Sequence, residues 1–316
     1  MHKRFVNHCT IDLTIAPCGP MLIKSGKEGA DPTKPDMEFV ETYHQGGRSI
    51  YLPGSSLKGA IRAHAERIVR TVGGDIEPQD PSQLWASDPL DRSLFRELEK
   101  EKDTRQVYRR SSFTDQMFGS TAIASRIRIE DAYPVDRTQL KIEERNGVAI
   151  DRVFGSVAVG PFNYQVCTGG EFRTKIHLKN FTLAQLGLMG LVLRDLDDGW
   201  FGLGFAKSRG MGLVEAKLNS AVVQYPGCVL DGDAIKAIGT QQRWSKTLLL
   251  GAGEFLETTE AGRYGFPKPD QQDTPVAGDE MPLGFGVQLT WSGPERVNDL
   301  FTRSVKSWSQ VLGVAA

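Results

Sequence analysis

The 316-residue chain has little cysteine, no long hydrophobic run and almost no net charge. Its four cysteines lie far apart without CxxC spacing, which argues against a zinc ribbon or a disulfide framework and suits a reducing cytoplasm. The start, MHKRFVNHC, lacks an apolar signal core, and the apolar stretch 183–193 is too short to span a bilayer. We therefore expect a soluble, cytoplasmic protein with no membrane partner.

The charge balance excludes a protein that binds nucleic acid through bulk positive charge. Thirty-eight Lys and Arg residues face 39 Asp and Glu residues, which gives a formal net charge of −1. Any nucleic-acid surface must come from local placement of Lys and Arg. A content of 40% hydrophobic and 24% charged residues is typical of a folded globular chain and excludes disordered and fibrous classes.

Residues 199–212, GWFGLGFAKSRGMG, combine five glycines with two cations. Glycine permits positive φ and close backbone approach, so successive N–H groups can line an anion site that neighbouring cations close. The sequence therefore predicts a phosphate-binding loop. Its candidate ligands are Gly202, Gly204, Lys207, Ser208, Arg209, Gly210 and Gly212.

This loop fits neither of two familiar nucleotide motifs. A P-loop needs glycine directly before Lys-Ser, where Ala206 stands, and GxGxxG needs glycine at Lys207. The structural alternative is a glycine-rich hairpin between residues 200–201 and 213–216.

A second basic candidate lies in residues 50–70, whose apolar side chains recur at helical spacing. Ser55 or Ser56 can cap the helix, and Lys58 and Arg62 share one face four residues apart. Because a helix N-terminus attracts anions, these cations mark a second candidate phosphate site. The alternative is a solvated basic face on an amphipathic helix.

Strands and helices alternate in an α+β pattern. Residues 4–16 and 172–181 favour strands, and about 182–196 a mostly apolar helix. Residues 125–135 alternate Ile and Arg, which predicts a strand with Ile127 and Ile129 on one face. Arg126 and Arg128 would then face solvent or RNA.

The remaining segments read as additions to this pattern. Turn signals at 146–147 and 155–156 predict a long projecting hairpin. The polar, mixed-charge stretch 72–110 predicts a surface insertion with a short helix. Composition shifts after residue 218, so we interpret residues 219–316 as an accessory extension that ends in a helix at about 294–312.

Five segments in order (29–42, 51–67, 118–135, 145–166 and 199–212) resemble the RAMP superfamily, specifically the backbone subunits of type III CRISPR effector complexes. The resemblance covers roughly residues 4–218. It implies a ferredoxin-like, RRM-related core over 1–218, with the insertion at about 72–110 and a thumb at about 136–165. The glycine-rich loop and helix cations would grip guide RNA, while the thumb wedges between guide and target bases. Guide RNA, target RNA and other subunits of the complex are the expected partners.

In many relatives a loop aspartate cleaves target RNA with a divalent cation such as Mg²⁺, and residues 22–47 hold the corresponding loop. Asp36 is the first candidate for catalysis and metal binding, Asp31 the second and Glu38 the third. The alternative for each acid is a solvated turn or cap residue. His44 could act as an acid or base, although an exposed loop histidine is more often incidental.

The resemblance predicts an RNA-guided endoribonuclease subunit, with two alternatives left open. One is a non-catalytic structural subunit of the same complex. The other is a RAMP endonuclease that processes precursor guide RNA; the hairpin and the hundred residues after the glycine-rich loop argue against it. No zinc is predicted, because SSFTDQMFGS lacks the cysteines that several relatives carry there.

Overall fold

The computed structural model describes residues 4–26, 35–44, 46–80 and 83–313. Its centre is a sheet in the order β15-β16-β9-β1-β8-β4, with β5 also paired to β8, and every pairing is antiparallel. The strands are β1 (His8–Pro17), β4 (Ile127–Ile129), β5 (Tyr133–Pro134), β8 (Phe172–Lys179), β9 (Val214–Tyr225), β15 (Asp279–Glu280) and β16 (Val287–Ser292).

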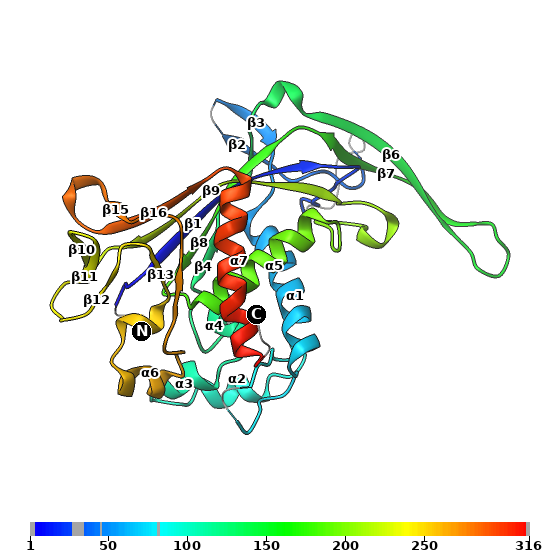
Figure 1. The fold of residues 1–316 in the computed structure, drawn as a ribbon. Coiled ribbons are helices and arrows are strands. Elements are labelled where there is room, and N and C mark those ends of the chain that lie inside the picture. Colours follow the sequence, from blue (N-terminus) through cyan, green and yellow to red (C-terminus); the bar gives the residue numbers. More distant parts are fainter. Residues whose placement is uncertain (1–3, 27–34, 45, 81–82, 314–316) are drawn as a thin grey trace.

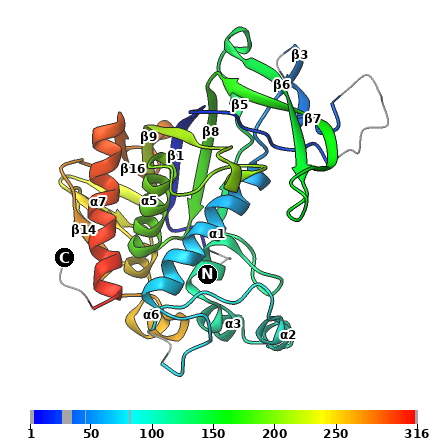
Figure 2. The same ribbon diagram turned by 90° about the vertical axis from the view of Figure 1, so that its right-hand side faces the viewer.

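Three long helices, α1 (Gly54–Val72), α5 (Leu183–Asp197) and α7 (Pro294–Val311), cover one face of this sheet (Figures 1 and 2). Ile11 and Leu13 of β1 are buried in the core cluster that the helices share with the sheet. Along the chain β1, α1, β4, β8, α5 and β9 follow a βαββαβ order, and their strands lie in the order β9-β1-β8-β4. This is the ferredoxin-like arrangement, which confirms the expected α+β fold.

Helices α5 and α7 approach each other closely because α5 carries glycine where α7 crosses it. A Cβ at Gly187 would lie 2.6 Å from the Ser304 carbonyl oxygen, and one at Gly190 would lie 2.6 Å from the Phe301 ring. The α5 N-terminus is closed by a capping box, in which Thr182 and Gln185 exchange side-chain-to-backbone hydrogen bonds. The predicted ends of both helices agree with the structure to within two residues.

Residues 219–316 share the central sheet and core with the rest of the chain. The expected boundary at 218 falls inside β9, β16 pairs with β9, and α7 packs against α5. The segment also contains smaller elements: β10 (Cys228–Asp231), β11 (Ala234–Ala237), β12 (Arg243–Ser245), β13 (Leu248–Leu250), α6 (Thr258–Tyr264) and β14 (Gln271–Asp273).

The expected hairpin is present as β6 (Lys141–Ile150) and β7 (Val157–Gly169), which project far from the sheet (Figure 1). At its turn the side chains of Val153 and Phe154 are more than 80% exposed. The insertion contains two short helices where one was expected, and the loop after β1 includes a small hairpin. These elements are α2 (Ser93–Leu98), α3 (Thr104–Arg110), β2 (Glu41–His44) and β3 (Gly47–Ile50), with α4 (Phe113–Phe118) following the insertion.

Candidate nucleic-acid interface

The glycine-rich stretch forms a loop between α5 and β9 that docks on the segment following β1. Phe205 N–H donates to the Leu22 carbonyl at 2.7 Å, and Gly212 N–H donates to the Pro20 carbonyl at 2.9 Å. Gly204 and Gly212 have φ values of +78° and +83°, and a Cβ on either would lie within 2.2 Å of a backbone oxygen. Glycine is therefore needed at position 204, where the loop docks on Leu22, and at position 212, where the loop closes on its own residue Leu203.

The tip of the loop, Lys207–Arg209, is a short 3-10 turn whose three side chains are all exposed. The Arg209 guanidinium lies 5.0 Å from the centre of the Phe205 ring, which supports the cation from one side. Gly210, at φ +79°, has open space around its Cα. Lys207, Ser208 and Arg209 are thus accessible to a phosphate.

The start of α1 differs from the expected serine cap. Pro53 is the N-cap residue, the helix begins at Gly54, and Ser55 and Ser56 lie in its first turn without capping it. Gly54 N–H donates to a carboxylate oxygen of Asp131 at 2.7 Å. The prediction of a serine cap was wrong because a carboxylate distant in sequence binds this helix end, where its negative charge also suits the helix dipole.

The two cations of α1 are held by the protein itself. Lys58 Nζ donates to Ser125 Oγ at 2.8 Å, and burial together with the nearby Arg62 charge lowers the pKa of Lys58. Arg62 donates at 2.7 Å to each of three acceptors. The acceptors are a Glu66 carboxylate oxygen, the Gly119 carbonyl and a carboxylate oxygen of the fully buried Asp115.

The expectation that Arg126 faces solvent was wrong. The strand starts only at Ile127, so Arg126 precedes it, and its side chain is 3% exposed. Its Nη1 donates to the Tyr108 hydroxyl and to the Asn180 carbonyl, both at 2.9 Å. Arg128 follows the predicted alternation: its side chain is 70% exposed and pairs with Glu130.

Asp36 is exposed and lies beside the base of the hairpin. Its Oδ2 accepts a hydrogen bond from the Asn163 backbone N–H of β7 at 2.8 Å. Asp31 lies outside the described residues, and the Glu38 carbonyl accepts a hydrogen bond from the Ser25 backbone N–H at 3.1 Å. The His44 ring stacks on Tyr133 with 3.7 Å between ring centres, so it is held in a ring contact.

Short backbone contacts bring the glycine-rich loop, the acidic segment and the hairpin base together. Met21 exchanges backbone hydrogen bonds with Cys167 of β7, next to Leu22, which accepts from the glycine-rich loop. Met37 pairs with β7 at Tyr164, one residue from the Asp36 contact. In the structure, three of the predicted segments that lie far apart in sequence therefore meet at one end of the molecule.

Two exposed side chains in this region were missed by sequence reasoning. Lys24 is exposed and lies two residues after Leu22, which contacts the glycine-rich loop. The sequence around Lys24 matches no motif that would have identified it. Trp200 is 68% exposed, with the Arg194 guanidinium 5.7 Å from its ring centre. An exposed tryptophan at the start of a basic loop is a signal that could have identified a base-stacking surface.

Mg²⁺ in enzymes is usually bound through one or two carboxylates together with substrate phosphate, and Asp36 offers one carboxylate at the hairpin base. Within the described ranges no group of three or more His, Cys, Asp or Glu side chains could hold a metal ion. Asp36 keeps one carboxylate oxygen that is not used by Asn163. This oxygen could supply one ligand to a cation whose other ligands come from RNA.

The chain matches the family model of the RAMP superfamily over residues 14–215 and belongs to that family. RAMP proteins generally bind RNA and act in multi-subunit CRISPR complexes. A search of curated proteins found no match. Among the described residues, no helix has the length and apolar character needed to cross a membrane.

Proposed function

We propose that this protein is a guide-RNA-binding backbone subunit of a type III CRISPR complex that cleaves paired target RNA at Asp36. The observation that carries the proposal is the meeting of the glycine-rich loop, the acidic segment and the hairpin base. Exposed cations at the loop tip would hold the guide backbone independently of sequence, through phosphate contacts. The exposed apolar side chains of the hairpin would lie against bases of the guide–target duplex.

Asp36 lies at the hairpin base, on a segment that pairs with residues 23–25 next to the glycine-rich loop, and a strand passing from loop to hairpin would present its backbone there. The Asn163 N–H orients the carboxylate and leaves one oxygen to accept a proton from an RNA 2′-hydroxyl or to bind a metal ion. A bound divalent cation would supply charge neutralisation at the scissile phosphate. Lys24, on the adjacent segment, would hold a neighbouring phosphate.

Cleavage of target RNA by the assembled complex in Mg²⁺ tests this proposal. Asp36→Asn keeps the acceptor for Asn163 N–H but removes the charge, so we expect the cleavage rate to fall at least about 100-fold while target binding is retained. Asp75→Asn, at an exposed acid of the insertion, is the matched control. Asp31→Asn, measured in parallel, tests the second candidate.

Each outcome separates the alternatives. If neither Asp36→Asn nor Asp31→Asn changes the cleavage rate, catalysis by this acidic segment is contradicted. The protein would then be a structural RNA-binding subunit. Metal-independent cleavage of repeat RNA by the isolated protein would instead indicate a processing endonuclease.

A further inference from the structure

A cavity separate from the candidate RNA interface lies between the insertion and α6. Its volume is about 570 Å³, within the range typical of small-molecule sites. Apolar side chains of Leu98, Val107 and Ile123 form part of its wall. Arg4 and Glu260 at its edge also line a neighbouring outer cleft, and both residues lie outside the family match of 14–215.

Arg126 lines this cavity and is an unusual buried cation. Its Nη1 is bonded, and the Tyr108 ring lies under its guanidinium with 4.2 Å between the Cζ atom and the ring centre. Its Nε and Nη2 are buried, and neither has a hydrogen-bond partner in the described part of the chain. The Tyr108 and Phe266 rings stabilise the charge through cation–π contacts, but they do not accept these two in-plane N–H groups.

The two unpartnered nitrogens are on the same edge of the guanidinium. Nε–H and one Nη2–H are parallel donors, which match two oxygens of a carboxylate or a phosphate. A buried N–H donor without an acceptor destabilises the fold, because it has lost its hydrogen bonds to water. An anionic group that reached this edge from the cavity would accept from both donors and remove that destabilisation.

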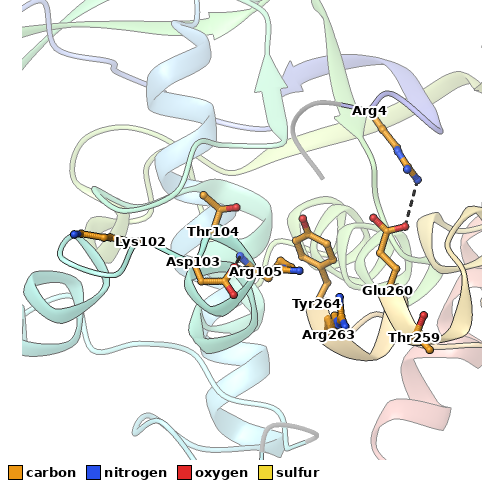
Figure 3. Close-up of a pocket in the computed structure, with 9 residues that line it drawn as sticks. All are labelled: Arg4, Lys102, Asp103, Thr104, Arg105, Thr259, Glu260, Arg263 and Tyr264. Atoms are coloured by element: carbon orange, nitrogen blue, oxygen red, sulfur yellow. Dashed lines mark hydrogen bonds and ion pairs between the residues drawn. The ribbon is translucent and has the colours of Figure 1, made fainter.

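The outer cleft has a basic character that suits an anionic ligand. Figure 3 shows Tyr264 between the side chains of α3 and Glu260, with Arg105 and Arg263 close to the ring. Arg4 is paired with Glu260 at 3.3 Å. Glu99 and Glu101 also line the inner cavity, so they would repel a ligand with several negative charges more strongly than one with a single charged group at Arg126.

We propose that this cavity binds a small organic anion, with a carboxylate or phosphate on the Nε/Nη2 edge of Arg126 and an apolar body against Leu98, Val107 and Ile123. The proposal is independent of the RNA interface, since none of its residues belongs to the loop tip or the acidic segment.

Calorimetric titration of the full-length protein with benzoate and with phenyl phosphate tests this site and distinguishes the two headgroups. Arg126→Lys keeps the charge but loses the paired donors, so we expect the Kd of the bound probe to rise at least tenfold. Ala122→Phe fills the cavity from another wall residue without altering Arg126, and we expect it to abolish binding. Arg128→Lys, at the exposed neighbour, should leave the Kd unchanged.

Failure of both probes to bind wild-type protein would overturn the proposal. Equal affinity in wild type, Arg126→Lys and Ala122→Phe would also overturn it, because binding would then lie elsewhere. Inorganic phosphate that binds as tightly as phenyl phosphate would contradict the apolar part of the site. These readouts use no RNA, so their outcome is separate from that of the proposed function.

Discussion

Two basic pairs of this molecule, Lys207 with Arg209 and Lys58 with Arg62, look equivalent in sequence but differ in the structure. The loop-tip pair is exposed to solvent. The α1 pair donates to acceptors of its own fold, and Arg62 alone makes three such hydrogen bonds. The comparison teaches that a cation beside a helix N-terminus can stabilise the protein as readily as bind a ligand.

The largest expected loss of stability comes from a substitution at Gly212, close to the loop tip. Gly212→Ala places a Cβ 2.0 Å from the Leu203 carbonyl oxygen at positive φ, so we expect a loss of about 3 kcal/mol in the free energy of unfolding. Gly210→Ala, also at positive φ but with open space, should cost only about 1 kcal/mol. Urea unfolding measures both, and equal losses would contradict the need for glycine where residue 212 meets Leu203.

The second prediction concerns the contribution of the α1 pair, Lys58 and Arg62, to the stability of the protein. Arg62→Ala leaves buried Asp115 without its cation, and we expect a loss of about 2 kcal/mol, reduced from the cost of breaking a buried pair because the Arg62 side chain is 30% exposed. The control Arg67→Ala, at an exposed position of α1, should change stability by less than about 0.5 kcal/mol. If urea unfolding shows that Arg62→Ala is as stable as the wild type, the hydrogen bonds of Arg62 do not stabilise the fold.

The third effect separates the pairs by RNA affinity. The double variant Lys207→Ala/Arg209→Ala should unfold like wild type but bind single-stranded RNA about tenfold more weakly, because two phosphate contacts are lost. Fluorescence anisotropy with a labelled RNA measures the affinity. Wild-type affinity in a folded double variant would contradict the assignment of RNA binding to the loop tip.

A smaller effect is expected at Lys24, the exposed cation beside the docked loop. Lys24→Ala removes one phosphate contact and should weaken RNA binding about threefold without a change in stability. The same anisotropy assay measures it, with Lys306→Ala on α7 as the control. A loss equal to that of the loop-tip double variant would move the centre of the interface toward Lys24.

The fold could be predicted where local signals and the resemblance agreed. Helix α5 carries its own capping box, and α7 starts at a proline with strong apolar periodicity, so their ends followed from the sequence. The turn signal at residues 155–156 lies at the end of the hairpin, whereas the one at residues 146–147 was wrong, because these residues lie within β6 and pair with β7. The pairing of β9 with β16 was missed, because the two strands are separated by about sixty residues and pair only in the folded chain.

The candidate site was less predictable, because its side chains form hydrogen bonds and ion pairs with residues that are distant in sequence. Asp131 reaches the start of α1 from 77 residues away, and Asp115 reaches Arg62 from 53. Arg126 precedes its strand by one residue, which turns its side chain into the core despite the alternating pattern. Each of these features depends on tertiary contacts that no local pattern specifies.

The salt dependence of RNA binding tests the central claim most directly. For single-stranded RNA, log K falls with log salt by about 0.7 for each phosphate contact. If Lys207 and Arg209 each neutralise a phosphate, their double alanine variant should show a slope shallower by about 1.4 than the wild type. An unchanged slope in the folded variant would contradict phosphate binding at the loop tip.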